Sequence, residues 1–189
     1  VIYADELAAR YSADAVRHYL LSEIPFAQDG NITYETFMNH YNTELANNLG
    51  NLVNRSIAMT VKYFNGKVCQ QPPADDFDRD LIACCKQTAE RYCTLMDAYH
   101  NAEAVQEVMA FAKRCNKYID ETAPWLLAKD DAARGRLEGV LFNLLECIRV
   151  LSVLLYPVTP ATAEKIAAQL NLAGGQPEIS EVVYGMHTE

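Results

Sequence analysis

The stretch AVQEVMAFAKRCNKYIDETAPW, residues 104–125, constrains this chain of 189 residues more than any other. Its apolar residues recur mostly three or four positions apart, which places them on one face of a helix: Ala104, Val105, Val108, Met109, Phe111, Ala112, Cys115, Tyr118 and Ile119. Pro124 then ends or interrupts that helix, because proline lacks a backbone donor and disfavours helical geometry in the preceding residue. We therefore predict a buried helical face, followed by a change of chain direction at the only tryptophan, Trp125.

The same periodicity predicts helices on both sides of this stretch, at about 5–11, 13–23, 77–99, 132–156 and 161–170. A long helix is also expected from an N-cap at Thr33, followed by the carboxylate of Glu35, to about Phe64, where Asn65 and Gly66 end it. Loops are predicted at Pro25, Asp29, Gly30, Asn31, Pro72 and Pro73. Gly174 and Gly175 open a polar tail that forms an extended strap or begins a linker; its apolar cluster is Ile179, Val182, Val183 and Tyr184.

Composition excludes several classes of protein. With 50% hydrophobic and 22% charged residues, the chain has the balance of a folded globular domain. Its richest apolar run, 140–156, is broken by Asn143, Glu146 and Arg149, so we expect a buried helix and no membrane partner. The start, VIYADELAAR, lacks the pattern of a signal peptide. The six cysteines include the adjacent Cys84 and Cys85 and form no CxxC pair, which predicts free thiols, no metal site and a cytoplasmic location.

Trp125 follows a proline at a helix end, where a large flat side chain can be half exposed. Such a ring suits stacking on an unpaired base, the usual way in which proteins hold single-stranded RNA. The alternative is an ordinary core or helix-capping aromatic. The net charge of -9 argues against a protein that grips phosphates over a wide surface, yet a few bases can be read at a local site.

Two polar residues of the long helix form a second candidate group. At about 100° per residue, one broad arc contains the apolar residues Tyr41, Leu45, Leu49, Leu52, Val53 and Met59. Asn51 and Arg55 lie together just outside its edge, one turn apart. An amide and a guanidinium placed in this way can read the Watson–Crick edge of an unstacked base. The alternative is a solvated helix flank.

Three runs resemble the methionyl-tRNA synthetase family. NKYIDETAPWLLAKD, residues 116–130, resembles its anticodon-recognition segment, and NTELANNLGNLVNRSIAMTVKYFNG, residues 42–66, resembles its other anticodon-facing helix. YSADAVRHYLLSEIPFAQDGNIT, residues 11–33, resembles the segment that follows the KMSKS loop. The resemblance implies an all-α helical bundle of the class Ia anticodon-binding type. It also implies a connector to the catalytic half at 1–32, the bundle at 33–172, and a tail or linker at 173–189.

Residue by residue, the resemblance implies that Trp125 stacks on the first anticodon base, a cytosine. Asn51 and Arg55 would then hydrogen-bond to anticodon bases. Pro124 would set the angle of the indole, and Asp120 would shape the site and repel wrong bases. The alternative for Asp120 is an exposed acid near a helix C-terminus, where the helix dipole disfavours a negative charge.

No catalytic residue is assigned. The chain lacks HIGH-type and KMSKS motifs and a phosphate-binding loop, and His18, His40, His100 and His187 are scattered without triad spacing. The resemblance implies a parent enzyme that uses ATP with Mg to activate methionine and then esterifies tRNA(Met). The chain itself would be an inactive, monomeric fragment without a cofactor, whose partners are the tRNA(Met) anticodon loop and the catalytic domain of the same polypeptide.

Three other interpretations stay open at this point. The chain could be a structural helical interaction domain with a buried Trp125. It could be the anticodon-binding domain of another class Ia synthetase, against which the Ala-Pro-Trp placement weighs. A free-standing helical enzyme is the third, and the missing catalytic constellation argues against it.

Overall fold

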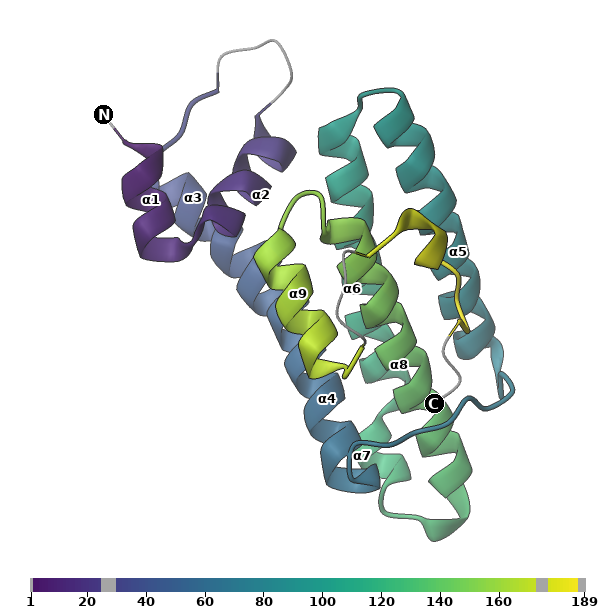
Figure 1. Cartoon of the computed structure of the whole chain (residues 1–189). Coiled ribbons are helices and arrows are strands. Elements are labelled where there is room, and N and C mark those ends of the chain that lie inside the picture. The colour runs from purple at the N-terminus through teal and green to yellow at the C-terminus, as the bar shows by residue number, and fades with distance from the viewer. Residues whose placement is uncertain (1, 25–29, 173–176, 187–189) are drawn as a thin grey trace.

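The apolar face of residues 104–119 forms the centre of the molecule: each of its nine predicted positions is at most 4% exposed. The computed structural model, which describes residues 2–24, 30–172 and 177–186, packs other helices around this face (Figure 1). Burial of apolar side chains is the main favourable contribution to folding, so this face anchors the bundle. Some predictions concern residues outside this described part: the loop at Pro25 and Asp29, the start of the tail at Gly174 and Gly175, and His187.

The described residues contain helices and no strand, which confirms the predicted all-α class. The α-helices are α1 (Ala4–Tyr11), α2 (Ala13–Glu23), α3 (Tyr34–His40), α4 (Asn51–Phe64), α5 (Asp76–Asp97), α6 (Asn101–Thr122), α7 (Pro124–Leu127), α8 (Arg134–Leu155) and α9 (Pro160–Gln169). A π-helix, η1 (Tyr41–Gly50), joins α3 to α4, and short 3-10 helices occupy η2 (Asp131–Ala133) and η3 (Ile179–Glu181).

Local signals in the sequence locate both ends of the long helix correctly. The Thr33 hydroxyl accepts from the Thr36 backbone N–H at 3.0 Å, and the Thr36 hydroxyl completes a capping box. At the other end, Asn65 adopts left-handed geometry with φ of 54°, and Gly66 has φ of 82°. These two residues end the helix because side chains other than Asn and Gly rarely enter that region.

The interior of the long helix differs from the prediction. Residues 41–50 are π-helical, and the Asn51 N–H bonds to the Ala46 carbonyl, five residues back. A Cβ on Gly50 would stand 3.1 Å from the Leu45 carbonyl oxygen, so this position suits a residue without a side chain. A π-turn takes up more residues than an α-turn. The residues that follow it are therefore shifted around the helix axis from where an unbroken α-helix would place them.

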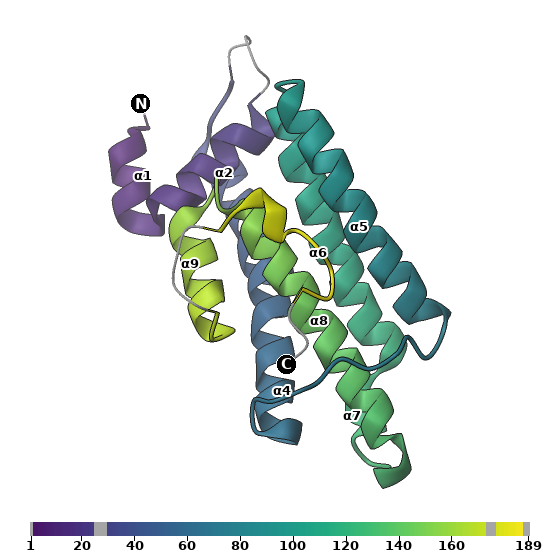
Figure 2. The ribbon, with the colours of Figure 1, turned by 45° about the vertical axis from the view of Figure 1, so that its right-hand side comes forward.

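The residues of the predicted apolar arc contact two clusters. Tyr41 and Leu45 pack against a small cluster in which α1, α2 and α3 contribute Leu7, Ala15, Val16, Tyr19 and Phe37. Leu49, Leu52 and Val53 instead belong to the main core around α6 and α8. The residues of the predicted arc, which lie in η1 and α4, therefore pack inward against one cluster or the other. Figure 2 shows the small cluster's helices beside one end of the main bundle.

The end of the chain lies across the bundle as a strap, which we define as residues 177–186 (Figures 1 and 2). Its anchor is a buried ion pair in α8: Arg149 Nη2 lies 2.8 Å from Glu146 Oε1, with both side chains at most 4% exposed. Arg149 donates to the Glu181 and Val183 carbonyls, and Glu146 accepts from the Gly185 and Met186 N–H groups. The two charges that interrupt the apolar run of α8 thus hold the strap in place.

Candidate nucleic-acid interface

Trp125 stands at a sharp change of chain direction. α6 ends at Thr122, Ala123 adopts left-handed geometry with φ of 42°, and Pro124 is the buried first residue of the single-turn α7. Proline suits that position because its missing N–H would have no partner in the first turn of a helix. The Trp125 side chain is 41% exposed, so the ring is neither sealed in the core nor free of the protein.

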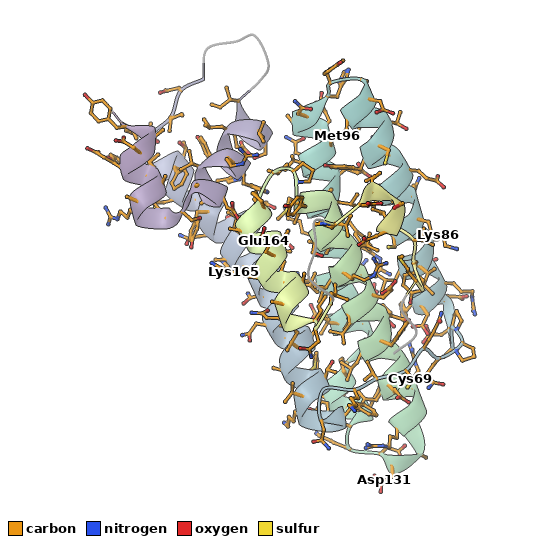
Figure 3. The ribbon with its side chains drawn as sticks, viewed as in Figure 1. Cys69, Lys86, Met96, Asp131, Glu164 and Lys165 are labelled. Atoms are coloured by element: carbon orange, nitrogen blue, oxygen red, sulfur yellow. The ribbon has the colours of Figure 1, made fainter. Side chains whose placement is uncertain are left out.

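The other two candidate residues lie on α4, the helix beside α6. Asn51 is exposed, and Arg55 donates from Nη2 to Asp120 Oδ1 at 3.1 Å. This bond joins the two segments that the sequence singled out, although they are 65 positions apart. α7 and the C-terminal end of α4 lie at the same end of the bundle, the end that Asp131 marks in Figure 3.

The ion pair between Arg55 and Asp120 is a surface pair, with side chains 39% and 67% exposed. Such pairs contribute only about 0 to 1 kcal/mol, because water competes for both charges. Asp120 also lies in the last turns of α6, where the helix dipole disfavours a carboxylate, and Arg55 offsets that penalty. The guanidinium can therefore exchange Asp120 for another acceptor at little cost.

A buried network of hydrogen bonds joins the last turns of α6 to α5 and α8. The Tyr118 hydroxyl donates to Asp78 of α5, which also accepts from Arg136 of α8 at 2.9 Å, and Asn143 donates to Tyr118. Burial and the bond to Asp78 raise the pKa of Tyr118, so the hydroxyl stays protonated as a donor. With these bonds made, the helix end that carries Asp120 and leads into Trp125 is held in one position.

Two amides that the sequence analysis did not select also connect the candidate segments. Asn48 of η1 donates to the Met109 carbonyl at 3.0 Å, and Asn116 of α6 donates to the Asn48 carbonyl at 3.0 Å. Asn48 is 5% exposed. Each amide lies within or beside a run of apolar positions, and a buried amide must find hydrogen-bond partners. That placement was the available signal in the sequence.

The histidines form no catalytic arrangement among the described residues. His18 and His40 are buried and share a bond of 2.8 Å between Nδ1 and Nε2, while His100 lies exposed beside Glu103. Burial and the nearby His40 lower the pKa of His18 to about 4. The pair lines a cavity of about 230 Å³ with Ser22, Glu23, Glu44, Gln106, Met109, Ala110 and Lys113. These histidines therefore join α2 to α3 as neutral structural groups.

Residues 78–183 match the family described as the anticodon-binding domain of tRNA ligase, and residues 1–57 match class I tRNA synthetases (M). Methionine–tRNA ligase of Clostridium perfringens is 46% identical over 165 residues, which cover 87% of this chain and 26% of that protein. Its counterpart from Caldanaerobacter subterraneus subsp. tengcongensis is 41% identical over 172 residues, 91% of this chain and 27% of that protein. The chain belongs to the methionyl-tRNA synthetase family.

Solved structures agree with this membership. Mycobacterium tuberculosis methionyl-tRNA synthetase bound by methionyl-adenylate superposes with a TM-score of 0.93 at 32% identity, over 100% of this chain and 37% of that one. Its apo form gives 0.92 at 32% identity, over 100% and 38%. The resemblance drawn from the three sequence runs is confirmed, and the matched part is the anticodon-binding region of methionyl-tRNA synthetases. The chain spans about a quarter of the length of its curated relatives.

Over residues 2–24, 30–172 and 177–186, no three His, Cys, Asp or Glu side chains gather closely enough to hold a metal ion. In the same part of the chain, no helix is both long and apolar enough to cross a membrane. The six cysteines of the chain are free thiols.

Proposed function

We propose that this chain binds the CAU anticodon of tRNA(Met), so that a parent enzyme can attach methionine to that tRNA. One observation carries the proposal: the Arg55–Asp120 bond of 3.1 Å connects the Asn51 and Arg55 face of α4 to the helix end that leads into Trp125. The half-exposed indole thus follows, five residues later, the acid that pairs with the guanidinium, and the amide lies one turn before that guanidinium on α4. Membership of the methionyl-tRNA synthetase family supports it.

In this proposal Trp125 stacks on the first anticodon base, a cytosine, and Pro124 sets the angle of the ring. Asn51 offers an amide donor and acceptor, and Arg55 a planar fork of donors, to the edges of the anticodon bases. The bases must be unstacked and splayed out before they can be read in this way, as they are in many RNA loops. A stacked base contributes about 1 to 3 kcal/mol.

Asp120 acts in the proposal as the residue that shapes the site and rejects wrong bases. Its carboxylate can only accept hydrogen bonds when ionised, so it repels a base that presents a carbonyl where cytosine presents an amino group. While the site is empty it holds Arg55. A correct base can then replace it as the partner of the guanidinium.

The parent enzyme would supply the remaining chemistry. We propose that it is a methionine–tRNA ligase that uses ATP with Mg. Its catalytic domain would belong to the same polypeptide, and residues 1–32 would be the connector that follows that domain. Residues 33–172 would be the anticodon-binding bundle and 173–189 the tail. The chain alone would be monomeric and inactive in aminoacylation, and the enzyme would act in the cytoplasm.

A fluorescence titration tests the proposal, because Trp125 is the only tryptophan. An anticodon stem-loop with cytosine first should quench its emission, and a stem-loop with uracil in that position should bind far more weakly. Arg55→Ala should reduce affinity for the cytosine stem-loop, while Asn54→Ala, an exposed amide on the same helix, should leave it unchanged. Emission that no stem-loop alters would favour a structural helical interaction domain instead.

A further inference from the structure

The segment that carries Asn51 and Arg55 is preceded by the π-helix η1, which ends at Gly50. In an α-helix each residue advances about 100° around the axis, so one residue gained or lost before Asn51 would swing its side chain by about that angle. The hydrogen bond from the Asn51 N–H to the Ala46 carbonyl shows that a π-turn closes directly at this residue. The direction in which α4 presents its polar face therefore depends on η1.

Something must hold η1 in that geometry, because π-helical turns are rare and occur mostly as single turns at functional positions. The buried Asn48 supplies a link to α6. Its amide nitrogen lies 3.0 Å from the Met109 carbonyl oxygen, and its side-chain and backbone oxygens accept from Asn116 Nδ2 at 3.2 and 3.0 Å. Asn116 Nδ2 also lies 3.2 Å from the Ala112 carbonyl of its own helix.

We call these two residues the amide clamp: Asn48 on η1 and Asn116 on α6. On η1 the clamp precedes Asn51 by three residues, and on α6 it precedes Asp120 by four. About one helical turn therefore separates it from the candidate residues on each helix. A bond between the Lys113 ammonium and Glu44, at 2.7 Å, joins the same two elements one turn earlier on each.

We propose that Asn48 and Asn116 are positioning residues, which lock η1 onto α6 and thereby set the angle at which Asn51 and Arg55 meet a base. Their importance for RNA rests on the proposed function, but their effect on side-chain orientation does not. Neither side chain needs to touch RNA, since Asn48 is buried and Asn116 is half-buried. The role resembles that of residues that hold a binding group within about 0.5 Å of its productive place.

Two measurements on the 189-residue chain test this proposal. The first follows the Asn51 side-chain amide and the Arg55 Nε–Hε group by nitrogen-15 NMR in Asn116→Ala, Asn48→Ala and the control Gln87→Ala, an exposed amide on α5. We expect both signals to shift in the two clamp variants and to stay in place in the control. The second is the ratio of affinities for stem-loops with cytosine and with uracil as the first anticodon base, which should fall about tenfold in the clamp variants.

The outcomes separate this proposal from the proposed function. Unchanged Asn51 and Arg55 signals in a folded Asn116→Ala protein would overturn the clamp as a positioning device, whatever happens to affinity. Shifted signals with a wild type that does not distinguish cytosine from uracil would support the clamp and sink the anticodon role. Asn116 is partly exposed, so its alanine variant should fold even if Asn48→Ala does not. A simple loss of stability would lower both affinities together and leave their ratio intact, which would also contradict the proposal.

Discussion

The indole of Trp125 is exposed enough to act as a platform, and its neighbour Leu126 is 55% exposed, which provides a matched control. Trp125→Ala should weaken binding of a fluorescently labelled cytosine stem-loop by about 1 to 3 kcal/mol, because a stacking surface is lost. Leu126→Ala should change the affinity little. Fluorescence anisotropy of the labelled RNA gives both values, and equal losses in the two variants would contradict the stacking role.

Asp120 provides a second prediction for a single residue. Asp120→Asn removes a negative charge while keeping size, so the uracil stem-loop should bind more tightly and the cytosine preference should fall about tenfold. The control is Asp97→Asn, which removes an exposed acid from the end of α5. Titrations with both stem-loops measure the preference. If the two variants behave alike, the effect of Asp120 is that of net charge alone.

At the scale of elements, the histidine pair that joins α2 to α3 predicts how stability varies with pH. An exposed histidine has a pKa of about 6.5, whereas burial keeps His18 neutral down to about 4, and burial also lowers the pKa of His40. Between these values the unfolded chain binds more protons than the folded one. The histidine pair should therefore leave the free energy of unfolding undiminished above pH 6.5 and lower it as the pH drops towards 4.

We expect the His18 contribution alone to remove about 2 kcal/mol between pH 7.5 and pH 5. Urea unfolding followed by circular dichroism measures this change. His18→Gln keeps a polar side chain without a titrating ring, so its stability should vary less over the same interval. An equal pH dependence in wild type and His18→Gln would contradict the assignment.

The buried pair that holds the strap to α8 leads to a prediction about stability. Arg149→Met leaves the Glu146 carboxylate buried without its cation, and breaking a buried pair in this way costs about 3 to 5 kcal/mol. The double variant Glu146→Gln with Arg149→Met should lose less, because no buried charge is left. Thermal unfolding compares them, with Arg79→Met as the control, since that residue pairs with Asp76 at the surface. A double variant less stable than Arg149→Met would contradict the argument.

The helices and their ends were predictable because local chemistry specifies them. Thr33, Asn65 and Pro124 act through their own backbone preferences, and the apolar spacing of residues 104–119 needs no partner to be recognised. The π-helix was not predictable, because no local signal in the sequence marks it. The contacts that accompany it, such as the bond from Asn48 to α6, depend on how the helices pack. The strap anchor was missed for a related reason. Glu146 and Arg149 interrupt an apolar run, and their pairing with residues 181–186 is a long-range contact.

The candidate site also has a part that the sequence predicted and a part that depends on how the helices pack. The resemblance selected Trp125, Asn51 and Arg55, and their roles stay predictions until RNA is tested. The bond between Arg55 and Asp120 could not be read from the sequence, because it depends on how α4 and α6 pack. The supporting bonds of Tyr118 and Asn116 depend on the same packing.

At the scale of the whole molecule, the charge of -9 predicts weak dependence of RNA affinity on salt. In the proposed site Arg55 contacts bases and no cation is assigned to a phosphate, so at most about one phosphate is neutralised. The logarithm of the affinity should then fall with that of the salt concentration with a slope no steeper than about -0.7. Anisotropy titrations over a salt series measure it. A slope several times steeper would indicate a phosphate-binding surface that the proposed site does not contain.

The long helix also has a mechanical consequence. Residues 34–64 run as one uninterrupted rod, with α3 seated among α1 and α2 and the end of α4 beside α7 (Figure 1). At about 1.5 Å per residue the rod is about 45 Å long, so a tilt of about 5° at its seat moves the far tip by roughly 4 Å. That displacement exceeds the length of a hydrogen bond. Leu49, Leu52 and Val53 pack into the main core along the middle of the rod, so the bundle resists such a tilt and keeps the far tip in place.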